Sequence, residues 1–418
     1  MPHATQRSSA PWAPGPARFI VLVCLLALVP CMNASRLSQF FGTKRHYFPV
    51  EDHNLHAALR PEARQHLADH CKPTSVYMVI RHSSRWPTAK HMSRYLKLAA
   101  VNWTSPFTQH VLDEGLLTPR GVHDARELGA QVASSDLRDL FAQGYHPRRF
   151  ELKSSRVIRA LQTAHGFAAG AFGSQAAVAI MSESLHVDTH LRFHKTCSKY
   201  QAHKPTAMSA DEEARVGKVM DDVVTRLVDT TGARLSHKGA LALWSACKFE
   251  VAAFDKADGA CAFFNDAVAA ELEYVEDVKD HWAKGSGHAL NHDMTCDLVK
   301  DIAQFTAAGN VTGKFMFGHA ETILPLVARL GLFTDVIVEG ALPRARKWRT
   351  GVVSPFTANV AIVSFACDDG QSVVDVRHNQ RSLDVSHLCP EGNHGLCSKL
   401  EFLQALRSDC DQTSICQI

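Results

Sequence analysis

A buried strand that runs directly into charged side chains constrains this sequence more than any other feature. Residues 75–80, SVYMVI, suit a buried strand, and RHSSR follows at once, with Arg81 and Arg85 on either side of His82. Two guanidinium groups held this close repel one another unless an anion lies between them. Ligands of open α/β sheets bind where strands end. The stretch therefore predicts an α/β sheet with an anion site at the end of this strand.

The rest of the chain alternates as such a sheet requires. Strand-like and helix-like segments follow one another over residues 75–190. A capping box at residues 209–212 then opens a long stretch with helical period and almost no strand signal. Strand-like text returns with GKFMF at residues 313–317. The pattern predicts a mixed sheet flanked by helices, with a helical insertion over about 190–300.

The N-terminus has the order of a secretory signal. Basic residues precede an apolar run at residues 19–29, and the small residues Cys31 and Ala34 follow. The run is shorter than the ~20 residues that span a bilayer. We therefore expect residues 1–34 to be a leader that is removed, with an uncleaved signal anchor as the alternative. No later segment is apolar enough to span, so we expect a secreted or lumenal protein without a membrane partner after cleavage.

Export also determines how cysteines and sequons are interpreted. Two of the 12 cysteines lie in or beside the leader, and the other ten form an even set suited to disulfides in an oxidising lumen. We expect Cys247 to pair with Cys261 and Cys389 with Cys397, because these cysteines are close in sequence. Sequons occur at Asn33, Asn102 and Asn310, and we expect glycosylation at Asn102 and Asn310.

Several classes of function are excluded. The formal net charge of +3 is too small to indicate a nucleic-acid partner. The sequence contains no CxxC pair, Walker loop, Gly-x-Ser-x-Gly elbow or HExxH helix, and no Cys has an Arg at the spacing that cysteine phosphatases need. Metal-ligand spacings are missing as well, so we expect neither a metal nor a cofactor.

A second strand ends in a histidine. FMFGHAET, residues 315–322, places His319 where a strand gives way to a helix, whose N-terminus offers free N–H groups and a favourable dipole to an anion. Glu321 is a carboxyl placed to protonate a leaving oxygen. Arg159 adds a third guanidinium at the start of a helix that follows a strand. Alone, His319 would be read as a helix cap and Arg159 as a surface residue, but together with His82 they predict a phosphate site.

These motifs resemble those of a known family. RHSSRWP, residues 81–87, is similar to the Arg-His-Gly-x-Arg-x-Pro signature of the histidine acid phosphatases, and FGHAETILPL, residues 317–326, resembles that family's second catalytic motif. Most members carry His-Asp in the second motif. His-Ala-Glu is the version of the multiple inositol polyphosphate phosphatases, and the similarity runs from about Cys71 to Cys410.

The resemblance implies a fold and a set of roles. The fold is a mixed-sheet α/β sandwich of the histidine phosphatase type, formed by residues 35–189 and 301–418, with an inserted, mostly α-helical cap domain at 190–300. His82 is implied to be the nucleophile that becomes phosphohistidine, and Glu321 the proton donor, with a pKa that we expect to be raised when substrate is bound. The implied phosphate ligands are Arg81, Arg85, Arg159 and His319.

The implied substrate is a small polyanion such as an inositol phosphate, and positive side chains suit it. The candidates are Lys90, Arg192, Lys195, Lys199 and the run Arg344, Arg346, Lys347 and Arg349. We expect two or three of them to touch substrate, and we assign Lys90, Arg192 and Lys195 to it. Reasoning from the residues agrees, because cationic neighbours lower the pKa of His82 and stabilise the charge of a transferring phosphoryl group without a metal.

Two positions depart from the family pattern. The glycine after the nucleophilic histidine is Ser83 here, and serine adopts a positive φ only at a cost. The Asn-Glu pair of phytases reads Asn379-Gln380. Neither change removes a catalytic group. The alternatives to an inositol polyphosphate phosphatase are a broad acid phosphatase that also acts on bisphosphoglycerate, and a relative that binds phosphate with weakened turnover.

Overall fold

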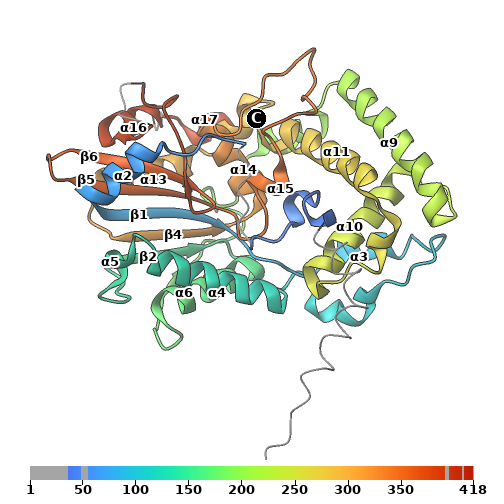
Figure 1. The fold of residues 1–418 in the computed structure, drawn as a ribbon, viewed down its shortest axis with the longest axis horizontal. Helices are drawn as coiled ribbons and strands as arrows, with labels where there is room; N and C mark the ends of the chain where they lie inside the picture. Colours follow the sequence, from blue (N-terminus) through green and yellow to red (C-terminus); the bar gives the residue numbers. More distant parts are fainter. Residues whose placement is uncertain (1–35, 49–54, 391–394, 407–408, 418) are drawn as a thin grey trace, which may run out of the picture.

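The computed structural model describes residues 36–48, 55–390, 395–406 and 409–417. The expected leader at 1–34 and the sequon at Asn33 lie outside the described residues. A single mixed sheet organises the fold, with strand order β3-β2-β4-β1-β5-β6-β7 and β8 paired to β6 (Figure 1). The strands are β1 (Cys71–Arg81), β2 (Phe150–Ser154), β3 (Ile180–Met181), β4 (Gly313–Gly318), β5 (Asn359–Cys367), β6 (Ser372–His378), β7 (Arg381–Ser382) and β8 (Cys397–Ser398). The mixed α/β sheet predicted from the sequence is confirmed.

The register of the central strands brings two loops together. β1 is parallel to β4, with Arg81 opposite Gly318, and β4 is parallel to β2, with Phe317 opposite Ser154. The carboxyl ends of the three strands are therefore level. β5 runs antiparallel on the other side of β1. Residues that follow β1, β4 and β2 consequently meet at one edge of the sheet.

Helices cover both faces of the sheet (Figure 1). On one face lie α4 (Pro119–Ser134), α5 (Arg138–Phe141) and α6 (Ile158–Phe172), and on the other α2 (Pro61–His70), α13 (Cys296–Ala308), α14 (Ala320–Arg329) and α16 (Lys399–Ala405). α4 and α6 pack so closely that a Cβ added at Gly170 would lie 1.9 Å from the carbonyl oxygen of Arg126. No side chain larger than a hydrogen atom therefore fits at Gly129 or Gly170.

The chain between β3 and β4 is helical. It contains α7 (Phe193–Thr196), α8 (Ser198–His203), η3 (Lys204–Thr206), α9 (Ala210–Thr231), α10 (His237–Phe254), η4 (Ala260–Phe263), α11 (Asp266–Lys284), α12 (Ala289–Asp293) and α13. Ser209 caps α9 by accepting a hydrogen bond from the Glu212 amide at 3.2 Å, at the position where the sequence predicts a helix start. α9, α10 and α11 lie beyond the edge of the sheet where the charged loops meet (Figure 1).

Three N-terminal segments pack against these helices instead of the sheet. They are η1 (Gly42–Lys44), α3 (Ala89–Tyr95) and η2 (Pro106–Asp113). Phe41 contacts Trp244 of α10 with ring centroids 5.4 Å apart, and α3 lies along α10. The hydrophobic core is therefore continuous between the helices and the sheet.

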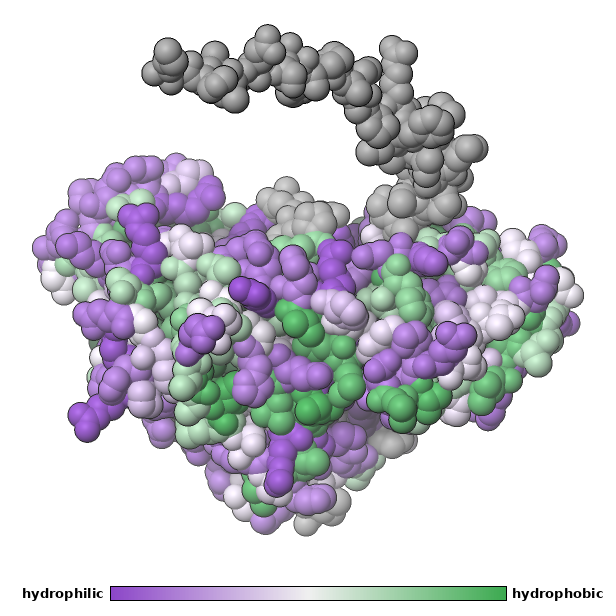
Figure 2. Space-filling view, turned by 90° about the horizontal axis from the view of Figure 1, so that it is seen from below, coloured by the Kyte–Doolittle hydropathy of each residue, from purple (hydrophilic) through white to green (hydrophobic). Residues whose placement is uncertain are grey.

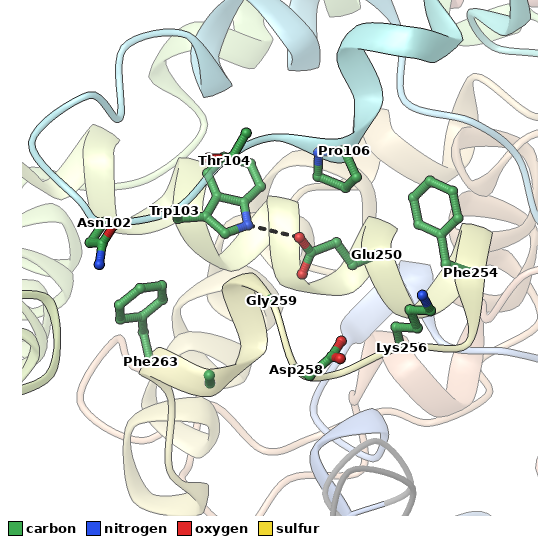
Figure 3. Close-up of a pocket in the computed structure, with 11 residues that line it drawn as sticks. Asn102, Trp103, Thr104, Pro106, Glu250, Phe254, Lys256, Asp258, Gly259 and Phe263 are labelled. Carbon is green, nitrogen blue, oxygen red and sulfur yellow. Dashed lines mark hydrogen bonds between the residues drawn. The ribbon is translucent and has the colours of Figure 1, made fainter. Parts of the chain in front are cut away.

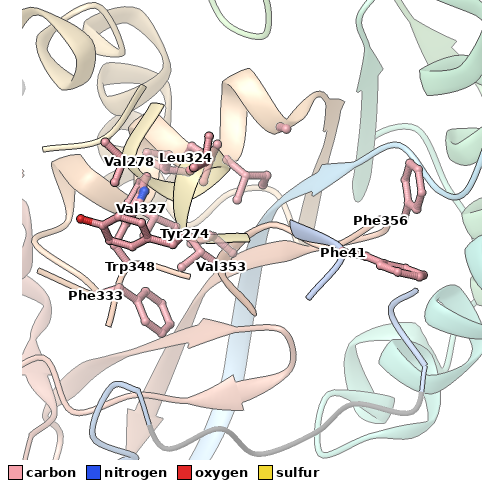
Figure 4. Packing of buried hydrophobic residues seen from close by; sticks show 14 of the residues in the cluster. Phe41, Tyr274, Val278, Leu324, Val327, Phe333, Trp348, Val353 and Phe356 are labelled. Atoms are coloured by element: carbon pink, nitrogen blue, oxygen red, sulfur yellow. The ribbon is translucent and has the colours of Figure 1, made fainter. Parts of the chain in front are cut away.

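Trp348 occupies a central position in this shared core. It is 1% exposed, and Figure 4 shows it beside Tyr274 and Val278 of α11 and near Val327 of α14. Val353 of α15 (Thr350–Val353) completes the group. Because His319 is the N-cap of α14, this packing fixes one catalytic candidate relative to the helical insertion.

Five disulfides join all ten cysteines outside the leader. The pairs Cys247–Cys261 and Cys389–Cys397 confirm the two local pairs predicted from the sequence. The other pairs are Cys71–Cys367, Cys197–Cys416 and Cys296–Cys410. The first of these links β1 to β5, so the strand that carries the predicted nucleophile is covalently tied to its neighbour.

The surface in Figure 2 shows hydrophobic residues in several patches that hydrophilic residues separate. Large exposed hydrophobic residues are spread over different elements, for example Leu96, Leu112 and Val336. Within the described ranges, no helix has the length and apolar character needed to cross a bilayer. Asn102 and Asn310, the two predicted glycosylation sites in these ranges, are both exposed.

Candidate active site

The two strand-end histidines lie next to each other. The backbone amide of His82 donates a 3.0 Å hydrogen bond to the carbonyl of Gly318, the residue before His319. The two imidazole rings are 5.6 Å apart between centroids, and both side chains are buried. The parallel register of β1 and β4 is the cause, since it sets Arg81 opposite Gly318.

His82 has the tautomer that a nucleophile needs. Its Nδ1 lies 3.0 Å from the carbonyl oxygen of Ser83, which can only accept, so Nδ1 carries the hydrogen. Nε2 is then left with its lone pair. Burial, followed by the charges of Arg159 and Arg81, holds the pKa of His82 well below its usual value. The ring therefore stays neutral and nucleophilic in acidic solution.

Three guanidinium groups surround this histidine. Arg81 donates from one Nη to the carbonyls of Thr43 and Ser354, and its guanidinium lies 4.7 Å from the ring centre of Phe356. Arg85 donates to the carbonyl of Trp86 at 2.8 Å. Burial lowers the pKa of Arg81 and that of Arg85 to about 9. This cost indicates a site shaped for an anion, because buried like charges are brought together and Glu321 offsets them only in part.

Buried donors at the site have no partner within the protein. The Nε atoms of Arg81, Arg85 and Arg159 are buried without a hydrogen bond. Arg159 is the second residue of α6, so it reaches the site from the end of β2. Buried N–H groups are normally satisfied, and an oxyanion offers several acceptor lone pairs to a set of guanidinium groups.

His319 is held by the third strand end. Its Nε2 lies 2.9 Å from the hydroxyl of Ser155, which follows β2, and its backbone amide donates to Thr322 Oγ1 at 3.0 Å. Its Nδ1 is buried without a partner. Burial and the charge of Arg159 keep its pKa well below the usual value.

Glu321 is the second residue of α14 and its side chain is 33% exposed. Burial alone would raise the pKa of this carboxyl, but Lys284 and the histidines His194 and His319 lower it well below its usual value. The Nζ of Lys284 is 3.7 Å from Glu321 Oε1. In the ligand-free protein Glu321 is thus ionised, whereas the sequence-based expectation of a raised pKa concerned the substrate-bound state.

The serine that replaces the family glycine fits its place without backbone strain. Ser83 is not among the described residues with positive φ, and its hydroxyl lies 2.7 Å from that of Thr357. Its amide donates to Thr163 Oγ1 at 3.0 Å. At the second departure, Gln380 donates to the Tyr47 hydroxyl at 3.1 Å.

The structure adds cations that the sequence gave no reason to select. Lys44 of η1 donates to Thr43 Oγ1 at 2.9 Å, and the carbonyl of Thr43 accepts from Arg81. Burial, then the nearby charge of Lys248, lowers the pKa of Lys44 to about 7. Lys248 of α10 forms an ion pair with Glu276. Both lysines come from segments without a strand-end signal, so only the tertiary fold places them here.

The positive side chains that the sequence suggests for substrate binding differ in exposure and in ion pairing. Arg192 is partly buried with its Nε buried and unpaired, and Lys90 and Lys195 are exposed. Their contact with substrate stays a prediction. The run at 344–349 is largely neutralised within the protein. Its ion pairs are Arg344–Glu271, Arg346–Asp277 and Arg349–Glu273.

Two groups of side chains among the described residues have the spacing of a metal site, and neither includes His82 or His319. In the first, Cys71 and Cys367 are joined in a disulfide. The second contains Glu183, Asp188 and His190, and the ammonium of Lys153 already pairs with Glu183. Neither donor set suits a divalent ion as it stands.

A cavity of about 550 Å³ lies beside α10, and its lining includes none of the proposed phosphate ligands (Figure 3). Glu250 forms one wall and accepts hydrogen bonds from Trp103 Nε1 at 2.8 Å and from the Ala260 amide at 2.6 Å. Burial raises the pKa of Glu250 to about 7. The ring of Phe254, also in the wall, lies 5.3 Å from the ring of Trp86, in the loop that follows β1.

Comparison with known proteins shows where this architecture recurs. Residues 74–379 match the profile of the family described as histidine phosphatase superfamily (branch 2). The chain is 29% identical over 388 residues to multiple inositol polyphosphate phosphatase 1 of Gallus gallus, covering 84% of this chain and 85% of the relative. It is 22% identical to phytase A of Aspergillus oryzae, covering 89% and 88%.

Solved structures share the fold at low identity. The phytase from D. castellii superposes with a TM-score of 0.72 at 15% identity and covers 91% of this chain and 87% of its own. The multiple inositol polyphosphate phosphatase of Bifidobacterium longum, in complex with inositol hexasulfate, gives a TM-score of 0.65 at 16% identity, with 89% and 98% covered.

Proposed function

Because the chain belongs to branch 2 of the histidine phosphatase superfamily, we propose that it removes phosphate from inositol polyphosphates through a phosphohistidine on His82. One observation carries the proposal. His82, with Nε2 free, lies among Arg81, Arg85 and Arg159 and beside His319. Glu321 follows two residues after His319 and supplies the carboxyl that the reaction needs.

In the first step, Nε2 of His82 attacks phosphorus as the P–O bond to inositol breaks. The guanidinium groups and His319 hold the equatorial oxygens, where negative charge accumulates in the transition state. The leaving alkoxide takes a proton from Glu321. In the second step water attacks the phosphohistidine, Glu321 takes the proton of that water, and the P–N bond breaks to release phosphate and neutral His82.

Excess positive charge supports a polyphosphate substrate over a simple monoester. The three arginines and His319 would hold one phosphate, yet Lys44 also interacts electrostatically with Arg81 and Arg85, and Lys204 with Glu321. Further phosphates on the same molecule would neutralise these cations. The relatives that bear the name multiple inositol polyphosphate phosphatase 1, and the Bifidobacterium longum complex with inositol hexasulfate, support the same class of ligand.

Five disulfides suit an oxidising compartment, and we propose that the protein is secreted or lumenal. Lys90, Arg192 and Lys195 remain part of the proposed substrate surface. The two sheet segments at 35–189 and 301–418 would form the α/β domain, and residues 190–300 the helical cap.

The experiment follows phosphate release from phytate, bisphosphoglycerate and p-nitrophenyl phosphate across pH. The His82→Ala variant should lose turnover of all three, and rapid quench of the wild type with labelled substrate should trap an acid-labile, base-stable phosphoprotein. The exposed His165 on α6 gives a matched control, since His165→Ala should keep full activity. Full turnover in His82→Ala would refute the covalent mechanism. Faster turnover of bisphosphoglycerate than of phytate would instead favour the broad acid phosphatase.

A further inference from the structure

The cavity beside α10 has a glycosylation sequon in its own wall. Asn102, Trp103 and Thr104 form the sequon Asn-Trp-Thr, and all three residues line this cavity of about 550 Å³. The volume lies within the range of ~300–1,000 Å³ that is typical of sites for small ligands. A residue that can carry a sugar thus lies at the edge of a space large enough to hold one.

The sequon has the exposure that modification requires. Asn102 and Thr104 are both exposed, and they lie in the irregular segment between α3 and η2. The Trp103 amide donates a 2.7 Å hydrogen bond to the carbonyl of Val101, which turns the chain at Asn102. The five disulfides suit a chain that passes through the oxidising compartment where sequons receive glycans.

Aromatic rings in the wall offer the surface on which a sugar packs. Trp103, Phe254 and Phe263 all line the cavity. Asn102 and Phe263 lie at one end of it and Phe254 at the other (Figure 3). The face of an aromatic ring carries partial negative charge, so it attracts the weakly positive C–H groups on one face of a sugar ring.

Polar side chains in the same wall suit the hydroxyl and N-acetyl groups of a sugar. Lys256 and Asp258 are exposed and line the cavity. Glu250 is 4% exposed and accepts a 2.8 Å hydrogen bond from Trp103 Nε1, which holds the indole ring in place. A few polar groups among apolar ones are what a ligand site needs to orient its ligand.

The wall also connects to the loop that follows β1. The ring of Phe254 lies 5.3 Å from that of Trp86 and 5.7 Å from that of Phe107 in η2. A molecule bound in the cavity would therefore join the segment that carries Asn102, helix α10 and η4, and would support the packing behind the loop after β1.

We propose that Asn102 carries an N-linked glycan whose first sugar residues bind in this cavity, against Trp103 and Phe263. In the transfer, Asn102 Nδ2 forms a bond to the anomeric carbon of a lipid diphosphate-linked oligosaccharide. The C–O bond to the diphosphate breaks, its electron pair leaves with the diphosphate, and Nδ2 loses one proton. This site does not depend on the phosphatase reaction, because it needs only passage of the chain through the secretory pathway.

The first test uses the full chain secreted from a eukaryotic host, in which mass spectrometry gives the occupancy of both sequons. Asn310 is the internal control, because it is exposed and is not among the residues that line the cavity. The measured quantity is the rate at which an endoglycosidase that cuts between the first two sugars releases each glycan. In the native protein we expect release at Asn102 to be about 10-fold slower than at Asn310, because the enzyme reaches a buried sugar only when the cavity opens. After denaturation the two rates should be equal, and Phe263→Ser should abolish most of the difference in the native protein.

A second test compares stability in two variants of one residue. Thr104→Ala removes the sequon, whereas Thr104→Ser keeps it. In the glycosylated protein, Thr104→Ala should lower Tm by roughly 2–4 °C and Thr104→Ser should match the wild type. In protein exported to the periplasm of a bacterium that adds no glycan, the two variants should have the same Tm.

Three results would overturn the proposal. They are an unoccupied Asn102 in the eukaryotic host, equal release of the two glycans from the native protein, and protection of the Asn102 glycan that Phe263→Ser leaves unchanged. If Phe263→Ser unfolds, the Thr104 pair decides, because equal Tm values of Thr104→Ala and Thr104→Ser in the glycosylated protein would show that the glycan does not bind in the cavity.

Discussion

Replacement of Ser83 tests what this serine contributes at the position where the family has a glycine. Thr357 has a φ of 64°, a left-handed conformation that a β-branched residue rarely adopts, and its amide lies 3.3 Å from the carbonyl of His82. The Ser83 hydroxyl lies 2.7 Å from that of Thr357, and both side chains are fully buried. This hydrogen bond therefore holds a strained residue against the backbone of the nucleophile.

The expected loss of stability follows from these contacts. Ser83→Ala leaves the buried Thr357 hydroxyl without a partner, which costs about 1–3 kcal/mol. Ser83→Gly adds the greater backbone freedom of glycine in the unfolded chain, about 0.4–1 kcal/mol. We expect Ser83→Gly to lose about 2–3 kcal/mol, a fall in Tm of roughly 3–6 °C for a large domain. Its kcat should stay within about 3-fold of the wild type, because no phosphate ligand is removed.

The assay is thermal and urea unfolding combined with phosphate release. A double-mutant cycle isolates the hydrogen bond, since Ser83→Ala should cost far less in a Thr357→Val background than in the wild type. An equal cost in both backgrounds would refute the proposed bond. A Ser83→Gly variant that keeps its stability but slows turnover more than 10-fold would show that the serine acts on the substrate.

Four further predictions concern charge, metal, pH and the disulfides. Lys44→Met should raise KM for phytate about 10-fold and leave KM for p-nitrophenyl phosphate unchanged, because a substrate with one phosphate does not need this cation. Equal changes in both KM values would contradict a role of Lys44 in binding a second phosphate group. Turnover should be unchanged by EDTA. Loss of turnover in EDTA that zinc or magnesium restores would contradict a mechanism without a metal. The raised pKa of Glu250, about 7, means that the folded state binds its proton more tightly. The contribution of this protonated carboxyl to the free energy of unfolding, about 3 kcal/mol, is fully present below pH ~4.3 and is lost as pH rises through 7. In Glu250→Gln, the free energy of unfolding measured in urea should therefore vary less between pH 5 and 8. Replacing Cys71 and Cys367 by Ser, across 296 residues of sequence separation, should cost about 3–5 kcal/mol in the same unfolding assay.

Local sequence was enough to predict those residues of the site that directly follow a strand. His82 and His319 each follow a hydrophobic strand, and parallel neighbours in a sheet bring such residues to one edge. The same logic reached Arg159, although a helical arginine has little specificity of its own. The disulfides Cys247–Cys261 and Cys389–Cys397 could be predicted because their cysteines are close in sequence.

The partners of charged side chains could not be predicted in this way. Arg346 and Arg349 looked like ligands for a polyanion, yet Asp277 and Glu273 of α11 neutralise them. Lys44 looked like an ordinary residue near the N-terminus, yet η1 carries it to the Arg81 guanidinium. A sequence shows which charges exist, but only the packing of distant helices decides which of them are compensated.

The protonation states at the site depend on the same long-range packing. His82 and Glu321 have pKa values pushed down for different reasons, the first by burial and guanidinium groups and the second by Lys284 at the end of α11. A free protein with a neutral nucleophile and an ionised carboxyl can bind a polyanion but cannot yet protonate a leaving group. The charge of the substrate must then create the acid form of Glu321, so binding and acid catalysis are coupled. Truncation of Lys284 to Met should break this coupling: Glu321 would be protonated at higher pH, and the pH optimum for alkyl phosphates should rise relative to that for p-nitrophenyl phosphate. An unchanged difference between the two optima would show that Lys284 does not control the acid.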